Sequence, residues 1–188
     1  LVATVEGDFG AFVMLEGHRR GADASWLAGA RAWHDYVERE IGYQEHAGGL
    51  CVNYFQKPRG MVPNNTSEWI AVLGILASIT GESRYLDRVP ALLTFLEAVQ
   101  LPSGELPYEL AGPHEPRTRL HYLCYQYNAF QCIKLAWYAI KHDDARARAL
   151  AEKLSDFLAT GVLADGAVRA SCSSRLPEVI YYADAVAE

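Results

Sequence analysis

The sequence lacks a basic excess, a long apolar run and paired cysteines, and each absence argues against a class of protein. Its 188 residues carry 17 Lys and Arg against 23 Asp and Glu, a net charge of −6. The arginines are scattered along the chain, which argues against a nucleic-acid-binding surface. The apolar stretch from Trp69 to Ile79 has the length of a buried helix, so we expect no membrane span. No charged segment followed by an apolar one stands at the N-terminus, so no secretory signal is visible.

Four cysteines are present, Cys51, Cys124, Cys132 and Cys172, and no two of them form a Cys-x-x-Cys pair. Cys124 and Cys132 are eight residues apart on one predicted helix, too far for a disulfide. We therefore expect reduced, mostly buried thiols, with zinc ligation as the alternative. No nucleophile, metal or phosphate motif is decisive, so no metal and no cofactor are expected. A cytosolic location is the default expectation.

A helical hairpin recurs about every sixty residues along the chain. Three expected inter-helix turns begin at Gly21, Gly81 and His142, which are 60 and 61 residues apart. A strongly apolar segment precedes each turn and an amphipathic segment follows it. A fixed period of this kind indicates stacked supersecondary units. Glycine-centred turns are then expected after the hairpins, at Gly49, Gly104 and Gly166.

The period predicts an all-α fold, a single domain over residues 1–188 with hairpins at about 8–39, 65–99 and 122–160 and a half hairpin at 176–188. Apolar first helices are predicted to lie inside and amphipathic second helices outside. Asn65 and Glu68 are predicted to form a capping box, and Pro90 to kink the return helix or start it afresh. The half hairpin predicts a fragment of a larger toroid. The remainder of a longer chain and a second copy of this chain are both left open as partners.

An inner helix, a short turn, an outer helix and a glycine turn are together the scheme of an α/α toroid. The segment from Phe95 to Leu106, with Gln100 and Gly104, resembles the glutamine–three–glycine repeat of squalene cyclases and protein prenyltransferases. Leu106 stands where that family has an aromatic residue, and its Asp-x-Asp-Asp acid motif and its zinc-ligand set are absent. In architecture the chain also resembles six-hairpin carbohydrate-active enzymes, which include glycoside hydrolases, polysaccharide lyases and sugar epimerases. Both resemblances imply an incomplete toroid.

In a toroid, the loops that lead into the inner helices line the mouth of the central cavity. Here these loops are rich in aromatic, amide and carboxylate side chains, which suit the C–H faces and hydroxyls of sugars. The catalytic candidates are Glu68 and Glu109 as an acid–base pair and His121 as a base. The substrate-binding candidates are Asn65, Trp69, Tyr108, Tyr125, Gln126, Tyr127, Asn128, Arg175 and Tyr181.

Structural roles compete with several of these assignments. Glu68 also fits a helix cap, and a loop histidine is often simply solvated. Tyr127, Gln131, Lys134 and Tyr138 share one helical face. If that face points inward, an amine lies in the cavity. If it points between helices, Lys134 pairs with a carboxylate or extends outward.

The leading function is therefore recognition or processing of a carbohydrate or glycan ligand, by a hydrolase, lyase or epimerase if the protein is an enzyme. Two alternatives stay open: an isoprenoid cyclase or prenyltransferase-like toroid, and a non-catalytic helical-repeat scaffold or accessory domain. A sugar site needs carboxylates and aromatic edges at a wet mouth, whereas an isoprenoid site needs a deep, dry aromatic pocket. A scaffold needs no convergent polar set.

Overall fold

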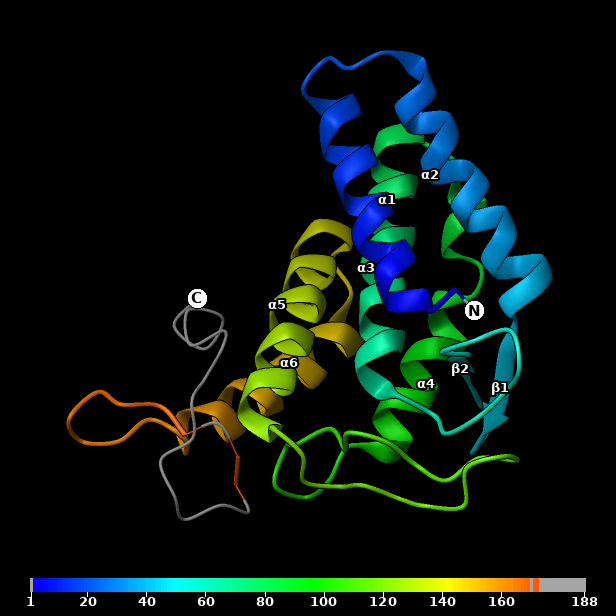
Figure 1. Cartoon of the computed structure of the whole chain (residues 1–188). Helices are drawn as coiled ribbons and strands as arrows, with labels where there is room; N and C mark the ends of the chain where they lie inside the picture. The colour runs from blue at the N-terminus through cyan, green and yellow to red at the C-terminus, as the bar shows by residue number, and fades with distance from the viewer. Residues whose placement is uncertain (1, 170, 173–188) are drawn as a thin grey trace.

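The computed structural model describes residues 2–169 and 171–172, and helices dominate it. Consecutive helices form three hairpins, α1–α2, α3–α4 and α5–α6 (Figure 1). The predicted all-α class is confirmed as a mostly α fold, and one small two-stranded sheet is the exception. The elements are α1 (Thr4–Arg19), α2 (Ala24–Tyr36) continued by a π-helical turn (Val37–Ile41), β1 (Tyr43–His46), β2 (Gly49–Val52), α3 (Pro63–Thr80), a 3₁₀ turn (Ser83–Leu86), α4 (Val89–Val99), α5 (Cys124–His142) and α6 (Ala145–Ala159).

The first helices of the hairpins pack side by side and form the inner layer. Helix α3 packs against α1 on one flank and α5 on the other, with α4 and β2 also touching it. Almost all of its residues from Pro63 to Ala77 are buried, as expected for a helix without a polar face. Helix α6 instead buries one stripe, which includes Ala147, Leu150 and Leu154. The inner and outer assignments from the sequence are confirmed in these helices.

The predicted inter-helix turns lie where the period placed them. Each contains a residue with a positive φ angle: 96° at Gly21, 72° at Gly81 and 50° at Asp143. This left-handed conformation ends a helix at little cost for glycine, and aspartate is among the few other residues that adopt it. Asp144 then accepts hydrogen bonds from the first-turn amides of α6, and Asp23 does the same for α2.

The predicted capping box at the start of α3 is wrong. The helix begins at Pro63, and no side chain caps it. Proline suits the first helical position because it has no N–H to satisfy there. Asn65 is therefore already inside the first turn, where its fully buried amide donates to the carbonyls of Val52 and Asn53 at 3.4 and 3.3 Å.

Two other local predictions have different outcomes. Pro90 does start a new helix, since a short 3₁₀ turn comes first and α4 begins at Val89. Gly49 is not a turn residue: it opens β2, and Gly48 makes the turn with a φ of 78°. A Cβ atom at Gly49 would overlap the α4 backbone at Phe95, so close packing rather than a turn requires glycine there.

The inner helices and the small sheet share one apolar core, which includes Trp69, Leu73 and Leu92. Within the described ranges, the structure contains no helix with both the length and the apolarity needed to cross a bilayer. The predicted half hairpin at 176–188 lies outside the described residues.

Candidate functional site

A long loop, residues 100–123, joins α4 to α5 and lies across one end of the inner helices (Figure 1). Its backbone pairs with the segment that leads into α3, since Met61 and Leu110 exchange two N–H···O bonds of 2.9 Å. Glu109 and Arg119 pair across the loop in the same way, at 2.9 and 2.8 Å. The loop is thus fixed against the entrances of α3 and α5. We call residues 105–122 together with the first turn of α5 the mouth.

The buried amide of Asn128 holds this loop on α5. Its Oδ1 accepts from Leu106 N at 2.7 Å, and its Nδ2 donates to Leu106 O at 3.1 Å and to Cys124 O at 2.8 Å. Asn128 is 1% exposed. The amide of Asn128, which was predicted to bind substrate, is therefore hydrogen-bonded to the backbone. Its role in the structure is to position the mouth.

Three tyrosines form an aromatic cluster in the mouth. The Tyr108 ring lies 4.7 Å from that of Tyr122 and 5.0 Å from that of Tyr127, both at steep angles. Tyr122 is 45% exposed, so part of the cluster faces solvent. Burial, with the neighbouring Tyr108 next, raises the pKa of Tyr127 to about 12, so its phenol stays protonated and can donate a hydrogen bond.

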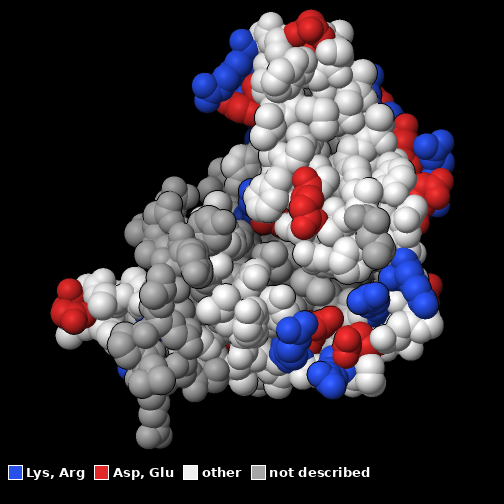
Figure 2. Space-filling view, viewed as in Figure 1, with Lys and Arg blue, Asp and Glu red and all other residues white. Residues whose placement is uncertain are grey.

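A charged pair borders these rings. The Arg119 guanidinium lies 4.8 Å from the centre of the Tyr108 ring, and its Nε donates to Glu109 Oε2 at 2.9 Å. Glu109 has 11% of its side chain exposed, against 54% for Arg119. Figure 2 shows acidic and basic side chains beside one another along this lower edge of the molecule. The mouth thus offers aromatic edges, a carboxylate and a guanidinium together.

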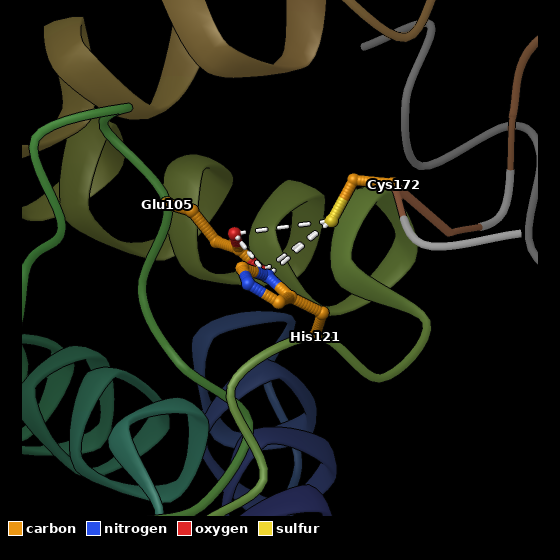
Figure 3. A group of neighbouring side chains, drawn as sticks. All are labelled: Glu105, His121 and Cys172. Carbon is orange, nitrogen blue, oxygen red and sulfur yellow. Dashed lines mark hydrogen bonds and ion pairs between the residues drawn. The ribbon is translucent and has the colours of Figure 1, made fainter.

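A second polar group lies at the mouth: Glu105 and His121 come from the long loop, and Cys172 comes from the segment after α6 (Figure 3). His121 Nδ1 lies 2.9 Å from Glu105 Oε2 and 3.5 Å from Cys172 Sγ. Cys172 Sγ is 3.9 Å from both carboxylate oxygens of Glu105. The Glu105 side chain is 2% exposed and that of His121 46%, so the group has a buried side and an open one.

Burial raises the pKa values of two side chains in this group, Glu105 and Cys172. It raises the pKa of the Glu105 carboxyl, although the nearby His121 opposes the shift. It also raises the pKa of the Cys172 thiol, to which the Cys124 thiol and then the Glu105 carboxylate add. Cys124 Sγ further accepts a hydrogen bond from Cys172 N at 2.6 Å, which fixes the backbone there. All four cysteines lie in the described residues, and they form no disulfide.

Glu68 lies away from the loop, between α3 and α5. Its carboxylate is 3.5 Å from Lys134 Nζ, which also lies 4.0 Å from the centre of the Phe12 ring. Burial raises the pKa of Glu68, and Lys134 opposes the shift. The fully buried Asp8 interacts electrostatically with both groups and accepts a hydrogen bond from Trp33 Nε1 at 2.8 Å. Lys134 thus pairs with a carboxylate between helices, and it also lines the pocket described below.

Three other predicted binding residues are buried. Trp69 is fully buried and donates from Nε1 to the Tyr43 hydroxyl at 2.9 Å. Tyr125 stacks on Phe157 with ring centres 4.9 Å apart and is 4% exposed. Gln126 is 6% exposed. These positions fit packing, and we give them no part in the proposals below. Arg175 and Tyr181 lie outside the described residues.

Sequence reasoning missed Glu105 and Asp8. Glu105 directly follows the glycine of the glutamine–three–glycine segment, a pattern that gives it no role, and only its contact with His121 marks it. The predicted first hairpin starts at about residue 8, whereas α1 begins at Thr4, so Asp8 lies within the helix and is buried. The sequence did contain a signal for Asp8: a carboxylate on an otherwise apolar helix face is unusual. The same signal marks Glu68 on α3.

A pocket of about 310 Å³ opens on the inner layer. Helices α1, α3 and α5 all contribute to it, and its walls are mostly apolar. The lining residues are Phe12, Leu15, Glu16, Ala71, Ile75, Ile133, Lys134 and Trp137. Lys134 therefore joins the buried carboxylates to a solvent-accessible hollow.

No family model matches the chain, and no curated protein matches it in sequence. Its similarity to solved structures is clear. It is similar to a D-mannose isomerase, with 14% identity and a TM-score of 0.70 over 90% of this chain and 44% of that one. It is also similar to a cellobiose 2-epimerase from Bacillus thermoamylovorans, with 12% identity and a TM-score of 0.71 over 90% of this chain and 48% of that one.

An α-mannanase from Bacteroides thetaiotaomicron is similar too, with 11% identity and a TM-score of 0.66 over 88% of this chain and 46% of that one. Identities this low establish the fold alone. The chain has the α/α toroid fold, and it spans less than half the length of each of the three.

Proposed function

We propose that this chain is part of an α/α toroid protein that recognises or processes a carbohydrate at the mouth. The observation that carries the proposal is the tyrosine cluster bordered by the Arg119–Glu109 pair. Tyrosine rings cover the apolar C–H faces of a sugar, and charged groups meet its hydroxyls. The similar isomerase, epimerase and mannanase, whose names all refer to sugars, support the proposal.

Of the two predicted acid–base carboxylates, Glu109 is the better placed to meet such a ligand. It borders the partly exposed tyrosines, whereas Glu68 is 2% exposed and pairs with Lys134 between helices. We assign Glu109 the acid–base role in the processing reaction, which is that of a glycan-active hydrolase, lyase or epimerase. The isoprenoid and scaffold alternatives gain no support from the three similar structures.

Calorimetric titration with neutral oligosaccharides, uronic-acid oligosaccharides and a prenyl diphosphate tests the proposal. We expect a carbohydrate to bind, and Tyr122→Ala to weaken binding about tenfold, since an aromatic contact contributes roughly 1 kcal/mol. The matched control is Ile140→Ala, which removes an apolar side chain that is 80% exposed near the other end of α5.

Unchanged affinity in Tyr122→Ala, or binding of the prenyl diphosphate alone, would contradict the proposal. For the reaction, product analysis with the carbohydrate that binds should show turnover in the wild type and at least a hundredfold loss in Glu109→Gln, in line with general acid–base contributions of about 10²–10⁴.

A further inference from the structure

The Glu105–His121–Cys172 group presents three donor atoms of different kinds to one point. The atoms are a carboxylate oxygen, an imidazole nitrogen and a sulfur, and all lie within 4.8 Å of one another. Glu105 and His121 are 16 residues apart in one loop, whereas Cys172 follows 51 residues after His121, so the fold brings Cys172 to the other two (Figure 3). We propose that these three side chains bind a zinc ion.

The separations of the donor atoms fit tetrahedral zinc. Zn–S, Zn–N and Zn–O bonds of about 2.3, 2.05 and 2.1 Å at tetrahedral angles put the ligand atoms about 3.4 to 3.6 Å apart. The Sγ to Nδ1 separation is 3.5 Å, and the Sγ to Oε2 separation is 3.9 Å. Nδ1 and Oε2 lie at 2.9 Å and would move apart by about 0.5 Å to admit the ion.

The same geometry argues against a cysteine nucleophile with a His–Glu base. Such a triad uses both imidazole nitrogens, one toward the nucleophile and the other toward the carboxylate. Here the sulfur of Cys172 and the carboxylate of Glu105 both approach Nδ1 of His121. One nitrogen cannot donate to one partner and accept from the other, whereas a metal ion at the centre binds all three atoms.

The charge of the ligands and the hydrogen bonds that hold them also suit a zinc ion. A thiolate and a carboxylate balance the charge of Zn²⁺, and sulfur with nitrogen ligands favours zinc over magnesium or calcium. Asn128 holds the backbone next to Glu105 through Leu106, and Cys124 holds the backbone of Cys172. Supporting contacts of this kind orient metal ligands.

Three protein ligands leave a fourth position for water, on the side where His121 and Cys172 are exposed. The site thus has the composition of an open zinc site rather than a closed structural one. In this site His121 is a ligand, which replaces the role of general base that the sequence predicted. It also replaces the expectation that the chain binds no metal.

The test uses the 188-residue chain, kept reduced, stripped with a chelator and titrated with Zn²⁺ against a chromophoric competitor. We expect one zinc per chain, and more than a hundredfold weaker binding in Cys172→Ser and in His121→Ala, since loss of even a supporting contact costs about 10- to 100-fold. With Co²⁺, the wild type should show a thiolate-to-metal charge-transfer band that Cys172→Ser lacks.

Cys132→Ser is the matched control, because Cys132 donates to the Ala151 carbonyl within the α5–α6 hairpin. It should bind zinc like the wild type. His121 is 46% exposed, so His121→Ala should keep the fold, which circular dichroism checks. Wild type without stoichiometric zinc, or with the same affinity as His121→Ala, would overturn the proposal. So would an equal loss in Cys132→Ser.

Discussion

The interior of the inner layer and the mouth both place a carboxylate beside a cation, but they expose the two partners differently. Between α3 and α5, Glu68 and Lys134 have 3% and 25% of their side chains exposed. In the mouth, Glu109 and Arg119 have 11% and 54% exposed. A charge in the interior depends on its partner, because water cannot replace it. A charge at the mouth keeps access to solvent and therefore to a ligand.

The largest expected effect comes from removing the interior cation. Lys134→Met leaves Glu68 and Asp8 without their shared counter-ion, so we expect the free energy of unfolding to fall by about 3 kcal/mol. Urea denaturation at pH 7 measures it. Lys153→Met, on the exposed face of α6, is the control and should change stability by less than about 0.5 kcal/mol. Equal losses of stability in the two variants would show that Glu68 and Asp8 do not depend on Lys134.

A smaller effect is expected on the pH dependence of stability, and it concerns Asp8 in the interior. Burial raises the pKa of Asp8 well above 3.8, the Trp33 hydrogen bond opposes this, and the charge of Glu68 adds to it. Between the unfolded and native pKa values, the unfolded chain binds fewer protons than the native one, so stability falls as pH rises through that window. Asp8→Asn keeps the acceptor for Trp33 and should flatten this slope and raise the melting temperature at pH 7.

Melting curves recorded from pH 4 to pH 8 check this expectation. Asp156→Asn, at an exposed position on α6, serves as the control and should follow the wild-type curve. An Asp8→Asn curve that runs parallel to the wild type would show that burial of this carboxyl has no thermodynamic consequence.

The smallest expected effect is at the mouth pair. Arg119→Gln removes a cation that is mostly exposed, so stability should change by at most about 1 kcal/mol. The same urea series measures it beside Lys134→Met. A loss as large as that of Lys134→Met would abolish the distinction between the two regions.

The sequence predicted the part of the fold that repeats. Turns at Gly21 and Gly81 follow from local chemistry, and an apolar α3 implies burial on all sides, so both could be predicted without the structure. The start of α3 could not, because Pro63 and the Asn65–Glu68 pair are competing start signals and only packing decides between them.

The site was less predictable for a physical reason. Tyr108, Tyr127, Glu109 and His121 are candidates from the sequence because they stand near the expected inner-helix entrances, where a toroid places its mouth. Glu105 was not assigned, since its contact with Cys172 joins positions 67 residues apart in the sequence. Trp69 and Tyr125 were assigned from residue type, but their side chains turn into the core.

The amide of Asn128 has a consequence for which changes of loop length the fold can accept. It binds the backbone at Leu106 and at Cys124, so a single side chain closes a ring around the residues between them. Insertions or deletions between Leu106 and Cys124 change the exposed part of the loop and leave the helices in place, because both anchored residues keep their positions. Residues 111–118 are the part of this ring most open to such changes, because Leu110 pairs with Met61 and Arg119 with Glu109 on either side of them.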